Sequence, residues 1–154
     1  MKIRYLDGER LRRALIAACD HARLSKADLN RINVFPVPDG DTGTNLALTV
    51  TSVSDELKRT RSDDVATVAK AAADAGIMGA RGNCGMILSH WLIGLSDGLR
   101  ERSRVYVDDL KGALRNATDH LYASMEKPVE GTMLTVMRET AEEAEQCTSE
   151  DIVE

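Results

Sequence analysis

The segment Ile87-Leu88-Ser89-His90-Trp91-Leu92-Ile93-Gly94-Leu95-Ser96-Asp97-Gly98-Leu99 has the most strongly apolar helical pattern in the chain. Its large apolar residues recur at the spacing that places them along one face of an α-helix: Ile87, Leu88, Trp91, Leu92, Leu95 and Leu99. Such a face has to be buried against other elements. The segment therefore predicts a central helix.

Comparable helical spacing occurs on both sides of this segment. Asp7 suits the N-cap of a first helix, and Ser25-Lys26-Ala27-Asp28 suggests a capping box for a short second one. Gly76 is expected to end a helix, and Asp108 or Asp109 to cap a later one. The apolar faces are formed by Leu11, Ala14, Leu15, Ala18 and Ala22; by Leu46, Val50, Val53 and Leu57; by Val65, Val68, Ala69, Ala72 and Ala73; by Leu110, Ala113, Leu114, Ala117 and Leu121; and by Met133, Val136, Met137, Thr140 and Ala144.

The composition supports a helical fold. Aromatic residues make up only 3% of the chain, which is low for a β-sandwich, whereas 43% hydrophobic residues is enough for one core of closely packed helices. Only short segments around residues 3–6 and 105–107 have a composition suited to strands. We therefore expect an all-α antiparallel helical bundle or barrel that forms one domain over residues 1–154.

Charge and cysteine content exclude several classes of protein. A net charge of -5 argues against a general affinity for nucleic acid or anionic membranes, which requires clustered Lys and Arg. The three widely spaced cysteines do not suggest a disulfide framework, and Cys19 and His21 lack nearby partners for a zinc site. The chain has no apolar signal region and no stretch long enough to span a membrane, so we expect a soluble cytoplasmic protein.

The segment Asn33-Val34-Phe35-Pro36-Val37-Pro38-Asp39-Gly40-Asp41-Thr42-Gly43-Thr44-Asn45 interrupts the helical pattern with prolines and glycines. Asp39 and Asp41 offer two hard oxygen ligands one residue apart. Because Mg²⁺ typically binds one or two carboxylates together with water and substrate phosphates, this pair suits a Mg-nucleotide. A calcium-binding EF-hand is excluded, since Thr44 and Val50 occupy the positions that need Gly and Glu. A solvated turn that only caps the next helix remains the alternative.

Two further breaks interrupt the helical pattern. The segment from Gly76 to Gly85 has a glycine at every third position, which lets the backbone approach a ligand closely. It matches neither a Walker A nor a Rossmann pattern, and a tight helix-helix connection is an equally good interpretation. The segment from Glu126 to Thr132 precedes Met133, whose thioether suits contact with an adenine ring or ordinary core packing.

All three loops lead into predicted helix N-termini, at Thr44, Met86 and Thr132. Helix N-termini present free N–H groups and the positive end of the helix dipole, which favours phosphate. The three histidines are scattered and suggest no Ser-His-Asp or Cys-His arrangement. Phosphoryl transfer fits this pattern, because the protein then mainly positions groups and neutralises charge.

Three motifs in this order strongly resemble those of the Dak2 (dihydroxyacetone-kinase-L-like) domain family. They are Asn33 to Leu46, Gly79-Ala80-Arg81-Gly82-Asn83-Cys84-Gly85-Met86-Ile87-Leu88-Ser89 and Lys127-Pro128-Val129-Glu130-Gly131-Thr132-Met133-Leu134. The chain is most similar to the bacterial fatty-acid kinase A branch of that family. The resemblance implies a closed barrel of antiparallel helices that binds ATP and two Mg²⁺ ions at one end and acts as a kinase.

The resemblance also implies residue roles. Asp39 and Asp41 would be the catalytic, metal-bridging carboxylates, and Asn33 would stand in the place of a third metal ligand that is Asp in dihydroxyacetone-kinase relatives. The nucleotide would be bound by Thr42, Thr44 and Asn45 at its phosphates, by Gly82, Asn83, Cys84 and Gly85 around the β and γ phosphates, and by Thr132 and Met133 beside the adenine.

The phosphoryl acceptor is left open by the residues themselves. The sequence of residues 33–38 favours the fatty-acid kinase branch. In that branch a separate DegV-like binding protein presents a fatty-acid carboxylate, which becomes an acyl phosphate. In the dihydroxyacetone-kinase branch the acceptor is a hydroxyl of a small triose. A non-catalytic nucleotide-binding module and a purely structural helical domain are the remaining alternatives.

Two features depart from the family pattern. Cys84 replaces the usual Ser, and a thiol is a poorer hydrogen-bond donor than a hydroxyl. Dak2 domains also continue with further helices, so we expect a domain that is incomplete at its C-terminal end. Because an open barrel would expose apolar helix faces, we predict homo-oligomerisation or domain swapping, which a monodisperse monomer in light scattering would contradict.

Overall fold

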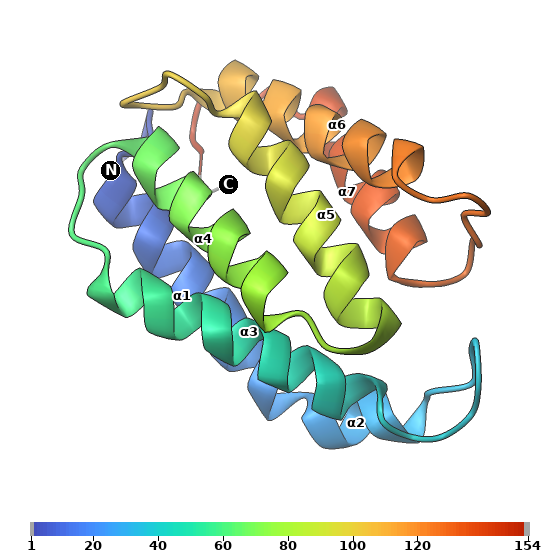
Figure 1. Ribbon diagram of the computed structural model, residues 1–154. Coiled ribbons are helices and arrows are strands. Elements are labelled where there is room, and N and C mark those ends of the chain that lie inside the picture. Colours follow the sequence, from blue (N-terminus) through green and yellow to red (C-terminus); the bar gives the residue numbers. More distant parts are fainter. Residues whose placement is uncertain (1, 153–154) are drawn as a thin grey trace.

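The computed structural model describes residues 2–152, which form seven α-helices (Figure 1). The helices are α1 (Gly8–Leu24), α2 (Lys26–Arg31), α3 (Thr42–Arg59), α4 (Val65–Gly79), α5 (Gly82–Gly98), α6 (Val107–Ala123) and α7 (Met133–Gln146). Over the same residues, β-structure is limited to one antiparallel bridge between Leu6 and Val105. The predicted all-α class is confirmed. None of the described helices has the length and apolarity that a membrane span requires.

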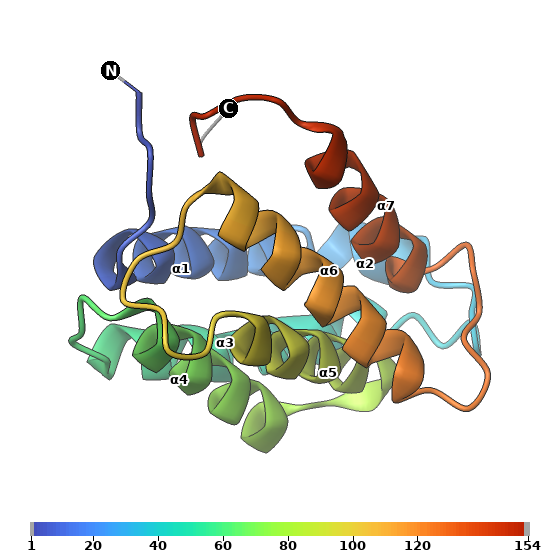
Figure 2. The same ribbon diagram turned by 90° about the horizontal axis from the view of Figure 1, so that it is seen from above.

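The six long helices form a curled row in which each packs on the next, in the order α1, α3, α4, α5, α6 and α7. The short helix α2 packs on α3. Figure 2 shows the curl, with α1 and α7 toward the same side of the layer made by α3, α4 and α5. Among the described helices, α1 and α7 do not pack extensively on each other, so the row stays open between them. The predicted central helix is α5, which lies between α4 and α6.

The core is built from aliphatic and small side chains. Helix α4 contributes an alanine-rich face, in which Ala69, Ala72 and Ala73 are buried, and α5 contributes Leu92 and Leu95. Short alanine side chains let neighbouring helix axes approach closely, which keeps the interior dense without large aromatic rings. The low aromatic content therefore matches the packing of the fold.

The close approach of α5 and α6 depends on a glycine. A Cβ atom added at Gly94 would lie 2.7 Å from the Cα atom of Ala117 and 2.7 Å from the Cβ atom of His120. Neither atom belongs to a flexible side-chain end, so the backbones themselves would have to separate. The amide of Asn116 spans the same interface and donates to the carbonyl oxygen of Gly94 at 2.6 Å.

The helix ends agree with the sequence in one case and differ in another. Asp7 is the N-cap of α1, and its side chain accepts a hydrogen bond from the N–H of Arg10 at 2.9 Å, as predicted. The capping box predicted at Ser25 is wrong, because the Ser25 hydroxyl donates back to the carbonyl oxygen of His21 at 3.1 Å. Ser25 therefore caps the C-terminal end of α1 with its side chain and does not cap the start of α2.

The predicted caps of α6 are also corrected. The helix begins at Val107 with Tyr106 as its N-cap, before either Asp108 or Asp109. Asp109 lies in the first turn, where its carboxylate accepts a hydrogen bond from the N–H of Tyr106 at 3.1 Å. A carboxylate in the first turn stabilises the helix in two ways, because it interacts favourably with the positive end of the helix dipole and accepts a hydrogen bond from the N-cap N–H.

The two strand-like segments meet at the start of the chain. Leu6 and Val105 exchange two backbone hydrogen bonds of 2.8 and 2.9 Å. The segment after α7 returns to the same place, where the N–H of Ile152 donates to the carbonyl oxygen of Ile3 at 2.8 Å (Figure 2). These backbone bonds tie both ends of the described chain together without forming a sheet.

Candidate functional site

The loop between α2 and α3 carries the predicted carboxylates on its outer surface. Asp39 and Asp41 are both exposed. The loop is organised by Asn33, whose side-chain NH₂ donates to the carbonyl oxygen of Val37 at 3.1 Å. The Asn33 oxygen accepts from the N–H groups of Asp41 at 3.2 Å and Thr42 at 3.4 Å. Asn33 therefore folds the loop back onto the start of α3.

A second asparagine, Asn30, ties α2 to the first turn of α3. Its side-chain oxygen accepts from the N–H of Thr44 at 3.0 Å, and its NH₂ donates to the Thr44 hydroxyl at 3.0 Å. The two helices touch at Gly43, where an added Cβ atom would overlap the carbonyl oxygen of Lys26. The small residue at position 43 is therefore required for α2 to reach Thr44.

The connection between α4 and α5 is much shorter than the glycine-rich loop predicted over residues 76–85. Helix α4 continues through Gly76 to Gly79, and α5 already begins at Gly82, which adopts a positive φ of 60°. Gly76 does not end the helix; an added Cβ atom there would lie 3.0 Å from the Leu92 side chain, so this glycine serves the packing of α4 on α5. The alternative interpretation, a tight helix-helix connection, describes most of this segment. The start of α3 is likewise two residues earlier than predicted, at Thr42, and that of α5 four residues earlier.

This connection packs directly on α3. The N–H of Arg81 donates to the buried Thr49 hydroxyl at 3.0 Å, and that hydroxyl donates to the carbonyl oxygen of Asn45 at 2.9 Å. A Cβ atom added at Gly82 would lie 2.7 Å from the side-chain nitrogen of Asn45, and one at Gly85 would lie 2.5 Å from the Thr49 hydroxyl. The glycines thus allow the start of α5 to lie against α3.

Cys84 joins the N-termini of the two helices. Its thiol is buried and donates to the carbonyl oxygen of Thr42 at an S···O distance of 3.4 Å. Burial raises the pKa of the Cys84 thiol, so the group is a neutral donor near pH 7. The thiol holds the beginning of α5 beside the carboxylate loop, and Asn83 next to it is exposed.

The two N-termini differ in what they leave for a ligand. At α3, the two asparagine side chains already accept hydrogen bonds from the N–H groups of Thr42 and Thr44. At α5, the N-cap Arg81 makes no side-chain cap, and helix geometry leaves the N–H groups of residues 82–84 without an acceptor inside the helix. The donors left at this junction are therefore the backbone N–H groups at the start of α5 and side chains of α3, which are groups suited to an anion.

The third loop lies at the same end of the molecule as the first two (Figures 1 and 2). Thr132 is the N-cap of α7, and its hydroxyl accepts from the N–H of Leu134 at 3.3 Å and donates to the carbonyl oxygen of Val129 at 2.9 Å. Met133 is half-buried at the start of the helix. The predicted N-terminus is confirmed to within one residue.

Glu130 anchors this third loop to α6 and α7. Its carboxylate accepts hydrogen bonds from the hydroxyls of Thr135 and Tyr122 and lies 3.4 Å from the guanidinium of Arg138. The bonds from Thr135 and Tyr122 hold the pKa of the Glu130 carboxyl below its ordinary value. Glu130 is therefore ionised at neutral pH and supports the loop that carries Thr132.

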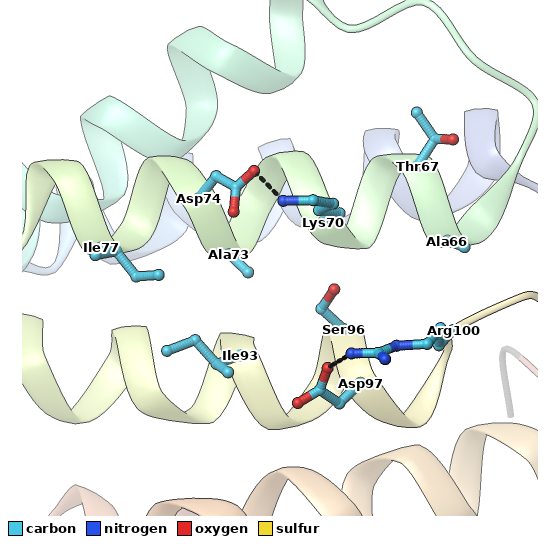
Figure 3. Close-up of a pocket in the computed structure, with 10 residues that line it drawn as sticks. All are labelled: Ala66, Thr67, Lys70, Ala73, Asp74, Ile77, Ile93, Ser96, Asp97 and Arg100. Carbon is cyan, nitrogen blue, oxygen red and sulfur yellow. Dashed lines mark hydrogen bonds and ion pairs between the residues drawn. The ribbon is translucent and has the colours of Figure 1, made fainter.

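A separate groove of about 470 Å³ lies between the outer faces of α4 and α5 (Figure 3). Ion pairs of 2.6 Å flank it, one between Lys70 and Asp74 on α4 and one between Asp97 and Arg100 on α5. Exposed pairs of this kind contribute little to stability. None of the residues predicted to bind a nucleotide lines this groove, so it is distinct from the candidate site.

Comparison with known proteins identifies the family. The DAK2 domain matches residues 36–154, which include the first loop from Pro36 onward and the whole of the other two loops. The chain belongs to the DAK2 domain family. It is therefore a dihydroxyacetone-kinase-like domain. It is 38% identical over 144 residues, or 94% of its length, to Protein YloV of Bacillus subtilis, and 39% identical over 121 residues, or 78% of its length, to uncharacterized proteins of Staphylococcus haemolyticus and Staphylococcus aureus. The chain spans only 26% and 22% of the length of these relatives.

The residues of this DAK2 domain fit a metal ion that is bound partly by the protein and partly by the phosphates of a ligand. Within residues 2–152, no three His, Cys, Asp or Glu side chains gather as a self-sufficient metal site. Asp39 and Asp41 supply two exposed carboxylates, which matches Mg²⁺ when phosphate and water complete its shell. The Asn33 oxygen accepts two hydrogen bonds, so metal binding there would require their rearrangement.

The thiols of this DAK2 domain should differ in reactivity. Burial raises the pKa of Cys84, and burial together with Asp20 raises the pKa of Cys19 to about 11, whereas Cys147 is exposed. Because the thiolate is the reactive form, we expect iodoacetamide at pH 8 to modify Cys147 at least about tenfold faster than either buried thiol. Mass spectrometry of timed samples measures the rates, with urea-unfolded protein as control. Equal rates for Cys84 and Cys147 in the folded protein would contradict the burial of Cys84.

Two residues of the site were not predicted from the sequence. Asn30 lies in a short helix that precedes the recognised motif, and Thr49 lies among the apolar residues of α3. Each acts through a contact with a residue far along the chain: Asn30 with Thr44, and Thr49 with Arg81. A buried polar side chain on an apolar helix face was the available signal for Thr49, since such groups need a partner. Asn30 offered no comparable signal.

Proposed function

We propose that this DAK2 domain binds Mg-ATP at the junction of α3 and α5 and takes part in transfer of the γ-phosphoryl group. The contact between Cys84 and Thr42 carries the proposal, because it places the exposed Asp39 and Asp41 loop beside the uncapped N-terminus of α5. Carboxylates for a cation and free N–H groups for phosphates are then adjacent, as a Mg-nucleotide requires.

The proposed roles follow from this arrangement. Asp39 and Asp41 would hold the cation, and residues 82–85 would wrap the β and γ phosphates, with the N–H groups of residues 82–84 as donors, since the Gly85 N–H already donates to the carbonyl oxygen of Arg81. Thr42, Thr44 and Asn45 would add side-chain contacts to phosphate, while Thr132 and Met133 would border the adenine. Bound Mg²⁺, in one or two ions, would neutralise charge on the phosphates during transfer. The protein's own contribution is positioning, since phosphoryl transfer needs no covalent protein nucleophile.

For the acceptor, we propose a fatty-acid carboxylate presented by a DegV-like partner. The support is the resemblance of residues 33–38 to the fatty-acid kinase branch. The carboxylate oxygen would attack the γ-phosphorus, the bond between that phosphorus and the β,γ-bridging oxygen would break, and ADP would leave together with formation of an acyl phosphate. The hydroxyl of a small triose is the alternative acceptor, and a non-catalytic nucleotide-binding module is the alternative function.

Calorimetric titration of Mg-ATP into the chain tests the nucleotide site. We expect saturable binding that disappears when EDTA removes Mg²⁺, because the two carboxylates would otherwise repel the phosphates. Circular dichroism under both conditions checks that the fold is retained. Absence of binding by the folded chain would refute the proposed site in this chain. Release of ADP in the presence of a candidate acceptor would then separate a kinase from a binding module.

A further inference from the structure

Asn30 makes a two-point contact with Thr44 from a different helix. Its side-chain oxygen lies 3.0 Å from the Thr44 backbone nitrogen, and its side-chain nitrogen lies 3.0 Å from the Thr44 hydroxyl oxygen. Both residues are half-buried. The contact is therefore a defined pair between α2 and the first turn of α3.

The backbone determines the orientation of the Asn30 amide. A backbone N–H can only donate, so the atom that faces the N–H of Thr44 has to be the amide oxygen. The NH₂ group consequently faces the Thr44 hydroxyl and donates to it. The hydroxyl oxygen is thus used as an acceptor, and its hydrogen has to point away from Asn30.

The Thr44 hydroxyl makes no second hydrogen bond within residues 2–152. Its hydrogen is available to an external acceptor, and Asn33 together with Asn30 has already taken the nearby N–H groups of Thr42 and Thr44. At this position α3 therefore offers the hydroxyl of Thr44 as a donor in place of the N–H groups of Thr42 and Thr44.

The close packing of α2 on α3 restricts the position of the Asn30 side chain. Gly43, the residue before Thr44, is buried against the α2 backbone, and an added Cβ atom would lie 2.9 Å from the Asn30 side-chain oxygen. Substitution at position 43 would displace the amide as well as the helix. Asn30 thus has little freedom to turn away from Thr44.

We propose that Asn30 is a positioning residue that orients the Thr44 hydroxyl as a hydrogen-bond donor to a phosphate oxygen of the bound nucleotide. This inference rests on the proposed function, since it requires Mg-ATP at the junction of α3 and α5. A hydrogen bond to a charged acceptor is stronger than one between neutral groups, so the hydroxyl hydrogen has a measurable effect on affinity.

The test is a double-mutant cycle in Mg-ATP affinity measured by calorimetry. Thr44→Val removes the hydroxyl with little change of shape, and Asn30→Ala removes the amide that orients it. Each change weakens binding about tenfold, because each loses one hydrogen bond to a charged group. The double variant is also weakened about tenfold, because both changes remove the same interaction.

Two further variants serve as controls. One separates the donor role of Asn30 from its role in folding, and the other tests whether any substitution in α2 affects binding. Asn30→Asp keeps the acceptor for the Thr44 N–H but replaces the donor by a second acceptor, so the hydroxyl turns inward and binding weakens at least as much as in N30A. Asp28→Ala changes an exposed residue of the same short helix and leaves the affinity unchanged. The amide resonance of Thr44 in ¹⁵N spectra shows that N30D retains the local fold.

The outcomes distinguish failure of the Asn30 positioning role from failure of the proposed Mg-ATP binding. If wild type fails to bind Mg-ATP, the proposed function fails, and the positioning role fails with it. If wild type binds but N30A, N30D or T44V binds equally well, the positioning role alone is overturned. A double variant weakened about a hundredfold would also overturn it, because independent effects would then multiply.

Discussion

Asp39→Asn and Asp41→Asn are each expected to abolish Mg-dependent ATP binding while leaving the helical content intact. Each substitution removes one charge and one strong metal ligand from the loop but preserves the size of the side chain. Changes to residues that only support a metal ligand lower metal affinity by about 10- to 100-fold, so loss of a ligand itself should lower it by at least about 100-fold. Calorimetry with Mg-ATP measures the loss, and circular dichroism checks the fold.

The substitutions should be tolerated by the loop. The Asp39 side-chain oxygen accepts a weak hydrogen bond from the N–H of Asp41 at 3.4 Å, and an asparagine oxygen can accept the same bond. Asp55→Asn is the matched control, because Asp55 is an exposed carboxylate on α3 away from the loop, and its removal changes net charge equally. Mg-ATP binding by D39N or D41N with wild-type affinity would rule out the metal assignment.

Gly94→Ala is expected to destabilise the fold by about 2 kcal/mol, because overpacking of a tight interior contact typically costs about 1–3 kcal/mol. The new Cβ atom would meet the Cα atom of Ala117 and the Cβ atom of His120 at 2.7 Å, which forces α5 and α6 apart. Separation would also stretch the bond from Asn116 to the Gly94 carbonyl oxygen. Urea denaturation followed by circular dichroism measures the change in the free energy of unfolding.

Gly112→Ala is the control for this substitution. Gly112 lies within α6, is exposed, and has no atom within 4 Å of an added Cβ. Alanine is favoured over glycine in a helix by about 1 kcal/mol, so this variant should be more stable than wild type. If G94A were stabilised to the same extent as G112A, the close packing of α5 and α6 would be refuted.

The helices were predictable because their signal is local. Leu92 and Leu95 fall on the predicted apolar face of α5 and are buried, and α5 lies between two neighbours as expected. Several boundaries were not predictable. Glycine is typical of loops, yet Gly76 and Gly82 lie in helices, and at each of them a side chain would meet a neighbouring helix. These glycines therefore serve close helix packing. Local preference was overridden there by packing.

The candidate site was partly predictable for a related reason. The motif around Asp39 and Asp41 is continuous in sequence, so its residues could be chosen without knowing the fold. The contributions of Asn30 and Thr49 could not be chosen in this way. Their hydrogen bonds join residues 14 and 32 positions apart, and nothing in the local pattern predicts such pairs.

The sequence by itself determined the all-α class, the buried faces of α3 to α6 and the three breaks that precede α3, α5 and α7, because these features depend on residues a few positions apart. The faces predicted for α1 and α7 are wrong in part: Ala14, Ala18, Val136 and Thr140 are exposed, whereas Cys19, Leu134 and Ala141 are buried, because the open ends of the row leave these two helices with fewer neighbours. The tertiary structure decided which breaks come together. Cys84 reaches Thr42, 42 positions earlier, only because α3, α4 and α5 pack side by side. The same packing decided that asparagine side chains occupy the N–H groups of Thr42 and Thr44 at the start of α3, while those of residues 82–84 at the start of α5 have no acceptor in their helix, since hydrogen-bond satisfaction depends on neighbours in space.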